Sequence, residues 1–169
     1  MKSKRLFFAL WPDDRQRVQL REQISPLANL VEGRAVYRGN WHVTTVFIGN
    51  FPDADLTDLQ SRAAEIAVEP FRLRFDRVEF WPRPKVASLV AAIVPPELQR
   101  LVDAQNSLLA DFGVKVEDRA YRPHITLVRR ARPFETQRLA QPADFEWSSF
   151  ELVESVPQPG GVTYRPMKQ

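Results

Sequence analysis

Residues 41–49 read WHVTTVFIG, and residues 123–129 read PHITLVR. Each segment contains a histidine, an aliphatic residue and then a threonine, and His42 and His124 are the only histidines among 169 residues. The β-branched and aliphatic composition of both segments predicts strands. Side chains two positions apart in a strand share a face and lie roughly 6.5 Å apart. Each segment therefore presents one imidazole and one hydroxyl, that of Thr44 or Thr126, on the same side.

Strand and helix patterns alternate on either side of these segments. Helices are expected to begin at residues 12–14, where aspartate can cap the first turn, and at residues 95–97, where proline suits it. A further helix is expected over residues 56–66, whose apolar positions have helical spacing. Pro26 is expected to kink or restart the first helix. The expected strands are residues 5–11, a short one around Tyr37, 41–49, 71–80, 86–94, 121–128, 145–156 and 162–166.

The two histidines divide the chain into similar halves. They are 124 − 42 = 82 residues apart, close to half of the chain, and a predicted helix precedes each motif strand. This arrangement suggests a degenerate duplication. Strand hairpins with three outer helices favour an α+β fold over a doubly wound parallel sheet. Because no linker is evident, residues 1–169 are expected to form a single bilobal domain with a cleft between its halves.

The composition excludes several classes of protein. The chain is 44% hydrophobic and 27% charged, as in soluble globular proteins. It contains no run of 18 apolar residues, so no membrane span is predicted. The absence of cysteine excludes disulfides and thiol chemistry, and a cytoplasmic location is expected. A net charge of +3 is too small for a non-specific nucleic-acid binder. The excess of 19 arginines over 5 lysines nevertheless suits a phosphate ligand.

A pair of imidazoles is suited to cleaving a phosphodiester, because one can protonate the leaving oxygen while the other activates water. Symmetry between the motifs leaves either assignment open. The threonine hydroxyls can donate hydrogen bonds to phosphate oxygens, and an arginine can neutralise charge that develops in the transition state. Arg129, three residues after Thr126, is the first candidate, and Arg122 and Arg130 are further candidates.

Other kinds of catalytic site are poorly supported by the sequence. A metal site without cysteine would need carboxylates, and no cluster of Asp or Glu adjoins either motif. Neither a metal nor another cofactor is therefore expected. The chain also has no Gly-x-Ser-x-Gly elbow, and its six glycines form no phosphate-binding loop.

The motifs and their flanks resemble the two-histidine (2H) phosphoesterases, a family defined by two His-x-Thr-x motifs. Within this family, the sequence is most similar to the bacterial RNA 2′,3′-cyclic phosphodiesterases, also called 2′-5′ RNA ligases. The resemblance extends over nearly the whole chain. It is carried by residues 5–10, 41–49, 80–86, 121–129 and 155–164, which read RLFFAL, WHVTTVFIG, FWPRPKV, YRPHITLVR and SVPQPGGVTY.

This resemblance implies an α+β fold with two pseudo-symmetric antiparallel sheets facing across a cleft and with the helices outside. It implies metal-independent hydrolysis of RNA 2′,3′-cyclic phosphate ends to 2′-phosphomonoesters, with 2′-5′ ligation as the reverse reaction. His42 matches the proton donor to the departing 3′ oxygen, and His124 matches the base that activates water. Thr44, Thr126 and Arg129 match the residues that hold the phosphate. The expected partner is RNA or an oligonucleotide with a 2′,3′-cyclic phosphate end, bound by a monomer.

Two residues depart from the family pattern. Thr45 stands where an aliphatic residue is more common, and it should face away from His42. Trp41 precedes the first histidine, where it is expected to shape the rim of the cleft or to stack on a base. In regular strands Phe47 and Tyr121 would face away from the histidines, so Phe47 is expected in the core rather than against a base.

Two alternative functions remain open. One is another 2H activity, such as trimming RNA 3′ ends or opening a small cyclic nucleotide. The other is a module that binds nucleotides or RNA without turnover. The intact histidines and threonines argue against such a module, since binding alone does not need two titrating groups.

Overall fold

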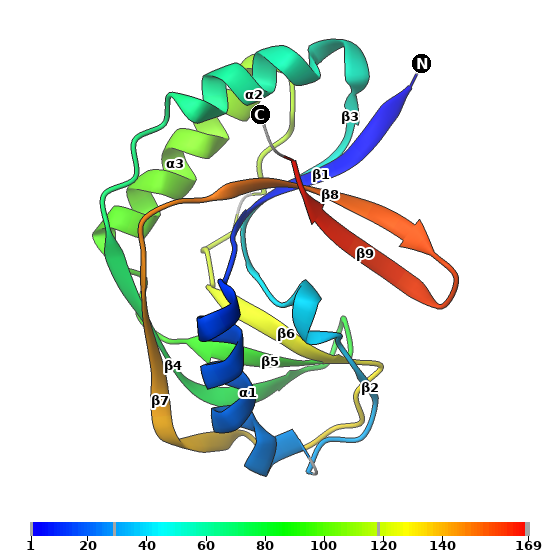
Figure 1. Cartoon of the computed structure of the whole chain (residues 1–169), viewed down its shortest axis with the longest axis vertical. Helices are drawn as coiled ribbons and strands as arrows, with labels where there is room; N and C mark the ends of the chain where they lie inside the picture. Colours follow the sequence, from blue (N-terminus) through cyan, green and yellow to red (C-terminus); the bar gives the residue numbers. More distant parts are fainter. Residues whose placement is uncertain (1, 29, 118, 168–169) are drawn as a thin grey trace.

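Two antiparallel sheets form the framework of the protein, shown as a computed structural model in Figure 1. The structure describes residues 2–28, 30–117 and 119–167. The first sheet contains, in spatial order, β3 (Val43–Pro52), β1 (Ser3–Leu10), β8 (Glu151–Gln158) and β9 (Gly161–Pro166). The second sheet contains β2 (Arg34–Ala35), β6 (His124–Arg129), β5 (Val86–Ala91), β4 (Phe71–Trp81) and β7 (Gln137–Trp147). The predicted α+β class is therefore confirmed.

The first helix begins where the sequence places a capping residue. In α1 (Asp14–Ala28), the Asp13 carboxylate accepts a hydrogen bond from the Gln16 N–H, and the Gln16 side chain accepts one from the Asp13 N–H, each at 2.8 Å. This reciprocal pair satisfies two amides that the first turn leaves free. The other helices are α2 (Leu56–Ala64) and α3 (Pro96–Asp111), and two short 3₁₀ turns are η1 (Arg38–Asn40) and η2 (Asp53–Asp55).

Each half of the chain follows the same order: a buried strand, a helix and then a strand carrying a histidine motif. In the first half these elements are β1, α1 and β3, and in the second half they are β5, α3 and β6. All residues of β5 are buried, as are residues 6–10 of β1. Each buried strand pairs directly with its motif strand. The two motifs therefore occupy equivalent places in two different sheets.

The helices connect the two halves. Although α1 follows a strand of the first sheet, it packs against β7 of the second sheet (Figure 1). Leu20 of α1 and Leu98 of α3 belong to a core cluster that includes Leu73 and Phe145 of the second sheet. The far end of α3 contributes Leu109 to the cluster of the first sheet. Helix α3 thus contributes to both cores.

Two of the predicted elements are wrong in detail. Residues 145–156 are not one strand: β7 ends at Trp147 in the second sheet, and β8 begins at Glu151 in the first. The apolar pattern continues through this region because each part faces a different core. The short strand expected near Tyr37 is β2, two residues earlier. Helix α1 does not restart at Pro26 but continues through it, so that a kink there stays a prediction. In the described part of the chain, no helix is both long and apolar enough to span a bilayer.

Candidate active site

The fold brings the two histidine motifs together from different sheets. His42 directly precedes β3, and His124 is the first residue of β6. The two strands contact each other, and the charge of His124 acts on the pKa of His42. Tyr121, just before the second motif, donates a hydrogen bond from its hydroxyl to the backbone oxygen of Thr44 at 2.8 Å. This bond directly links the two motif segments, and sequence reasoning did not assign it.

Both imidazoles are held by the same kind of hydrogen bond. The Nδ1 atom of His42 lies 2.7 Å from the Asn40 carbonyl oxygen, and that of His124 lies 2.8 Å from the Arg122 carbonyl oxygen. A carbonyl can only accept, so each Nδ1 must carry the proton. In both cases the acceptor is two residues before the histidine. Each Nε2 is therefore left for proton exchange, and that of His42 lies 2.9 Å from the Thr44 hydroxyl.

Burial lowers the pKa of both histidines. The pKa of His42 falls from 6.5 to about 4, because burial outweighs its bond to the Asn40 carbonyl and because positive neighbours, among them His124 and Arg129, disfavour its charge. The pKa of His124 is also lowered, chiefly by burial and further by the charge of Arg122. In the free protein at neutral pH, both imidazoles are therefore uncharged. A bound anion would offset these effects and raise both pKa values.

An indole lies against each histidine, and an arginine lies over each indole. Trp11 is stacked on His42 with 6.0 Å between ring centroids, and Trp81 lies 4.4 Å from His124. Arg17 lies over the ring of Trp11 at 5.0 Å, and Arg122 lies over that of Trp81 at 4.7 Å. Sequence reasoning assigned no role to these indoles or to Arg17. The two-fold repetition is a second point of similarity between the halves.

A bulge interrupts each motif strand at the residue after the motif threonine. Ala9 and Phe8 of β1 pair with Thr44 and Val46, so Thr45 is the extra residue. Ser88 and Ala87 of β5 pair with Thr126 and Val128, so Leu127 is the extra residue. A bulge reverses the alternation of side chains beyond it. Residues five positions after each histidine are therefore brought onto the face of that histidine.

Arg129 reaches the histidine face because of this bulge. His124, Thr126 and Arg129 pair with Val90, Ser88 and Val86, which alternate on a single face of β5. The Arg129 side chain lies 3.2 Å from the Tyr164 hydroxyl, and the Tyr164 ring lies edge-on to His42 with 5.0 Å between centroids. The structure thus brings His42, His124, Thr44, Thr126 and Arg129 to one region.

Phe47 is the equivalent residue of the first motif, and its predicted place in the core is wrong. It pairs with Phe7, whose ring contacts His42, and it remains 46% exposed. Trp41, in contrast, is buried in the core, and Thr45 is also buried. A regular strand pattern could not reveal Phe47, because the bulge leaves no clear mark in the sequence.

The other candidate arginines have different surroundings. Arg122 forms an ion pair with Glu79 at 3.0 Å. Arg130 is exposed, and within the described ranges it makes no side-chain hydrogen bond or ion pair. Among the residues that the structure describes, no group of three or more His, Cys, Asp or Glu side chains is arranged to hold a metal ion.

Comparisons with known proteins agree with this arrangement. Residues 10–91 match the family model described as LigT-like phosphoesterase. The RNA 2′,3′-cyclic phosphodiesterase of Escherichia coli K12 is 30% identical over 170 residues, covering 98% of this chain and 95% of that protein. Its counterpart in Archaeoglobus fulgidus is 27% identical, covering 97% of this chain and 98% of that protein.

A solved structure extends the similarity to the whole fold. The crystal structure of E. coli LigT complexed with 3′-AMP superposes with a TM-score of 0.88 at 27% sequence identity, covering 99% of this chain and 97% of that chain. The matched region of the family model contains the first motif, and the structural match includes both. This chain therefore belongs to the LigT-like phosphoesterase family.

Proposed function

We propose that this protein hydrolyses RNA 2′,3′-cyclic phosphate ends to 2′-phosphomonoesters, using His42 and His124 as an acid-base pair without a metal. The observation that carries the proposal is the matched pair of Nδ1 hydrogen bonds, which leaves Nε2 as the proton-exchanging atom of both imidazoles. The names and full-length coverage of the relatives support the same reaction.

The reaction follows from the chemistry of these groups. The cyclic phosphate binds between the two Nε2 atoms. Nε2 of His124 accepts a proton from water as the water oxygen attacks phosphorus, and the bond between phosphorus and the 3′ oxygen breaks. Nε2 of His42 then donates its proton to that 3′ oxygen. Thr44, Thr126 and Arg129 stabilise the negative charge on the non-bridging oxygens. The reverse reaction would join this end to a 5′-hydroxyl in a 2′-5′ linkage.

The proton donor must become charged before it can act. Because the pKa of His42 is about 4 in the free protein, few molecules carry this proton at neutral pH. A phosphodiester anion placed beside the imidazole favours its charged form. Substrate binding would therefore charge the donor. The Thr44 hydroxyl, which is bonded to Nε2 of His42 in the free protein, would turn toward the phosphate.

Phe47 favours a nucleotide substrate. Its half-exposed ring lies on the histidine face of the first sheet, and the guanidinium of Arg5 lies 5.0 Å from its centroid. An aromatic ring of this kind can stack on a nucleobase. As further parts of the proposal, RNA with a cyclic end is the partner, and residues 1–169 act as one bilobal domain in a cytoplasmic monomer.

The test is to incubate the protein in EDTA with an RNA that ends in a 2′,3′-cyclic phosphate. The expected product carries a 2′-phosphate, with the RNA length unchanged. A requirement for added metal would overturn the mechanism. Release of single nucleotides would favour 3′-end trimming, and binding without turnover would favour a non-catalytic module.

A further inference from the structure

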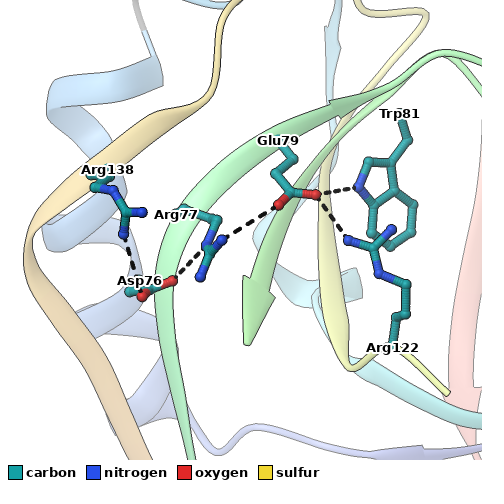
Figure 2. A network of polar contacts seen from close by, with 6 residues as sticks. All are labelled: Asp76, Arg77, Glu79, Trp81, Arg122 and Arg138. Carbon is teal, nitrogen blue, oxygen red and sulfur yellow. Dashed lines mark hydrogen bonds and ion pairs between the residues drawn. The ribbon is translucent and has the colours of Figure 1, made fainter. Parts of the chain in front are cut away.

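Glu79, near the end of β4, is the centre of the polar network drawn in Figure 2. One carboxylate oxygen accepts hydrogen bonds from the Trp81 indole and from the Arg122 guanidinium, each at 3.0 Å. The other oxygen lies 3.9 Å from Arg77, which is paired with Asp76 at 2.9 Å. The Glu79 side chain is only 22% exposed, so these three contacts fix its orientation.

Both hydrogen-bonded partners of Glu79 contact His124. The Trp81 ring packs against the imidazole at 4.4 Å between centroids. The backbone oxygen of Arg122 accepts a hydrogen bond from Nδ1 of His124 at 2.8 Å. The guanidinium of Arg122 lies over the Trp81 indole at 4.7 Å. One carboxylate therefore holds both the ring beside the imidazole and the residue that fixes its tautomer.

We propose that Glu79 is a positioning residue that holds His124 through Trp81 and Arg122. This inference rests on the proposed function, in which His124 is the base. The charged groups near the imidazole are Arg122 beside it and Glu79 and Arg77 on β4, and the titratable group on the other sheet is His42. Loss of the carboxylate would leave the guanidinium without its counter-ion and would free the indole to rotate. The proton-accepting Nε2 would then lose its alignment with the attacking water.

The test compares Glu79→Ala, which removes both hydrogen bonds, with Glu79→Gln, which keeps an acceptor for the indole. Asp76→Asn is the matched control, because Asp76 belongs to the same network but contacts neither Trp81 nor Arg122. Two properties are measured: kcat on a 2′,3′-cyclic nucleotide, and the ¹⁵N signals of the His124 ring, which report the tautomer without any reaction.

We expect Glu79→Ala to lower kcat about tenfold, within the roughly hundredfold that a misplacement of about 1 Å can cost. We expect it to give a mixture of His124 tautomers, while Glu79→Gln is intermediate and Asp76→Asn resembles wild type. Unchanged kcat and ring signals in a folded Glu79→Ala protein would overturn the inference. If that variant does not fold, Trp81→Phe replaces it, since it keeps the ring but loses the bond to Glu79. An inactive wild-type protein with the predicted ring signals would instead refute the proposed function alone.

A separate observation concerns Arg34 on the edge strand β2. Arg34 pairs directly with Arg129, so the two side chains share the face that carries His124 and Thr126. Both reach the hairpin of β8 and β9, where Arg34 donates to the Gly160 carbonyl at 3.2 Å and Arg129 contacts Tyr164. Like charges directly opposite each other destabilise a sheet. Within the described part of the chain, neither arginine has a carboxylate partner, so an anion is the group that would offset their repulsion.

We infer that Arg34 binds the next phosphodiester of the RNA, on the 5′ side of the terminal nucleotide. The test measures kcat/KM for a dinucleotide and a mononucleotide, both ending in a 2′,3′-cyclic phosphate. The ratio of the two values should exceed one in wild type and fall by roughly threefold to tenfold in Arg34→Gln, with a smaller salt dependence for the dinucleotide. Arg132→Gln, which removes an exposed arginine paired with Glu32, is the control. An unchanged ratio in Arg34→Gln would overturn the inference, whereas inactivity of wild type on both substrates would refute the proposed function instead.

Discussion

The two histidines share one hydrogen-bonding pattern but differ in their surroundings. His42 is enclosed by the rings of Phe7, Trp11 and Tyr164, whereas His124 has one indole against it. Sequence could identify both imidazoles, because they belong to the only two histidines of the chain and each is followed two positions later by a threonine. It could not identify their acceptors, because these are backbone carbonyls, which every residue possesses.

The lowered pKa values predict an acidic optimum for kcat/KM, which reports the free enzyme. On the acidic limb, kcat/KM falls because the base gains a proton. On the alkaline limb, kcat/KM falls because the acid releases its proton. Because the fold lowers both pKa values, that of His42 to about 4, both limbs of the profile should lie below pH 6.5. The profile of kcat should lie at higher pH, since the bound anion raises these pKa values. A maximum of kcat/KM above pH 7.5 would contradict this expectation.

At the scale of elements, the bulges at Thr45 and Leu127 explain where regular strand reasoning failed. Strand positions and helix caps were predictable from apolar spacing and from residues such as Asp13 and Pro96. The bulge residues are ordinary strand residues, so the sequence does not distinguish them from their neighbours. Consequently, strict alternation of side chains along a regular strand would place Arg129 and Phe47 on the faces opposite the histidines, whereas both lie on the histidine faces. The break between β7 and β8 was missed for a similar reason, since apolar residues continue across it.

The Tyr121 hydroxyl is expected to stabilise the contact between β3 and the segment before β6. Its bond to the Thr44 backbone oxygen is half-buried, and burial raises the Tyr121 pKa well above its ordinary value. Tyr121→Phe should lower the free energy of unfolding by about 1 kcal/mol, as measured by urea denaturation. Tyr37→Phe is the control, because the Tyr37 ring is 72% exposed and its hydroxyl has no hydrogen-bond partner in the described ranges. Equal stabilities of the two variants would show that the bond contributes nothing.

At the scale of the whole molecule, helices α1 and α3 join the two sheets into shared cores. The sequence predicts that these helices have apolar faces, but an apolar face does not specify which sheet it covers. Packing of α1 on the second sheet follows from the tertiary fold, not from its place in the chain. Because these helices pack across both sheets, His42 and His124 are held in fixed relative positions although they belong to separate sheets.

Burial of neutral His42 predicts that stability falls with acidification. The unfolded chain takes up a proton near pH 6.5, but the folded protein does so only near pH 4. The free energy of unfolding that is due to this group therefore falls by roughly 3 kcal/mol at most as pH decreases from 6.5 to 4. Below pH 4 it changes no further. His42→Gln should show a shallower loss over this range in urea denaturation. The same slope in wild type and variant would contradict the lowered pKa.

The central claim is that His42 and His124 act as one catalytic unit. The most direct test is kcat for hydrolysis of a 2′,3′-cyclic phosphate in EDTA, measured for wild type, His42→Ala, His124→Ala and the double variant. Each single substitution should lower kcat by roughly 10²-fold to 10⁴-fold. The double variant should be little slower than the slower single variant, because residues that act together lose their joint effect when either is removed. Full activity in either single variant, or losses that multiply in the double variant, would contradict the claim.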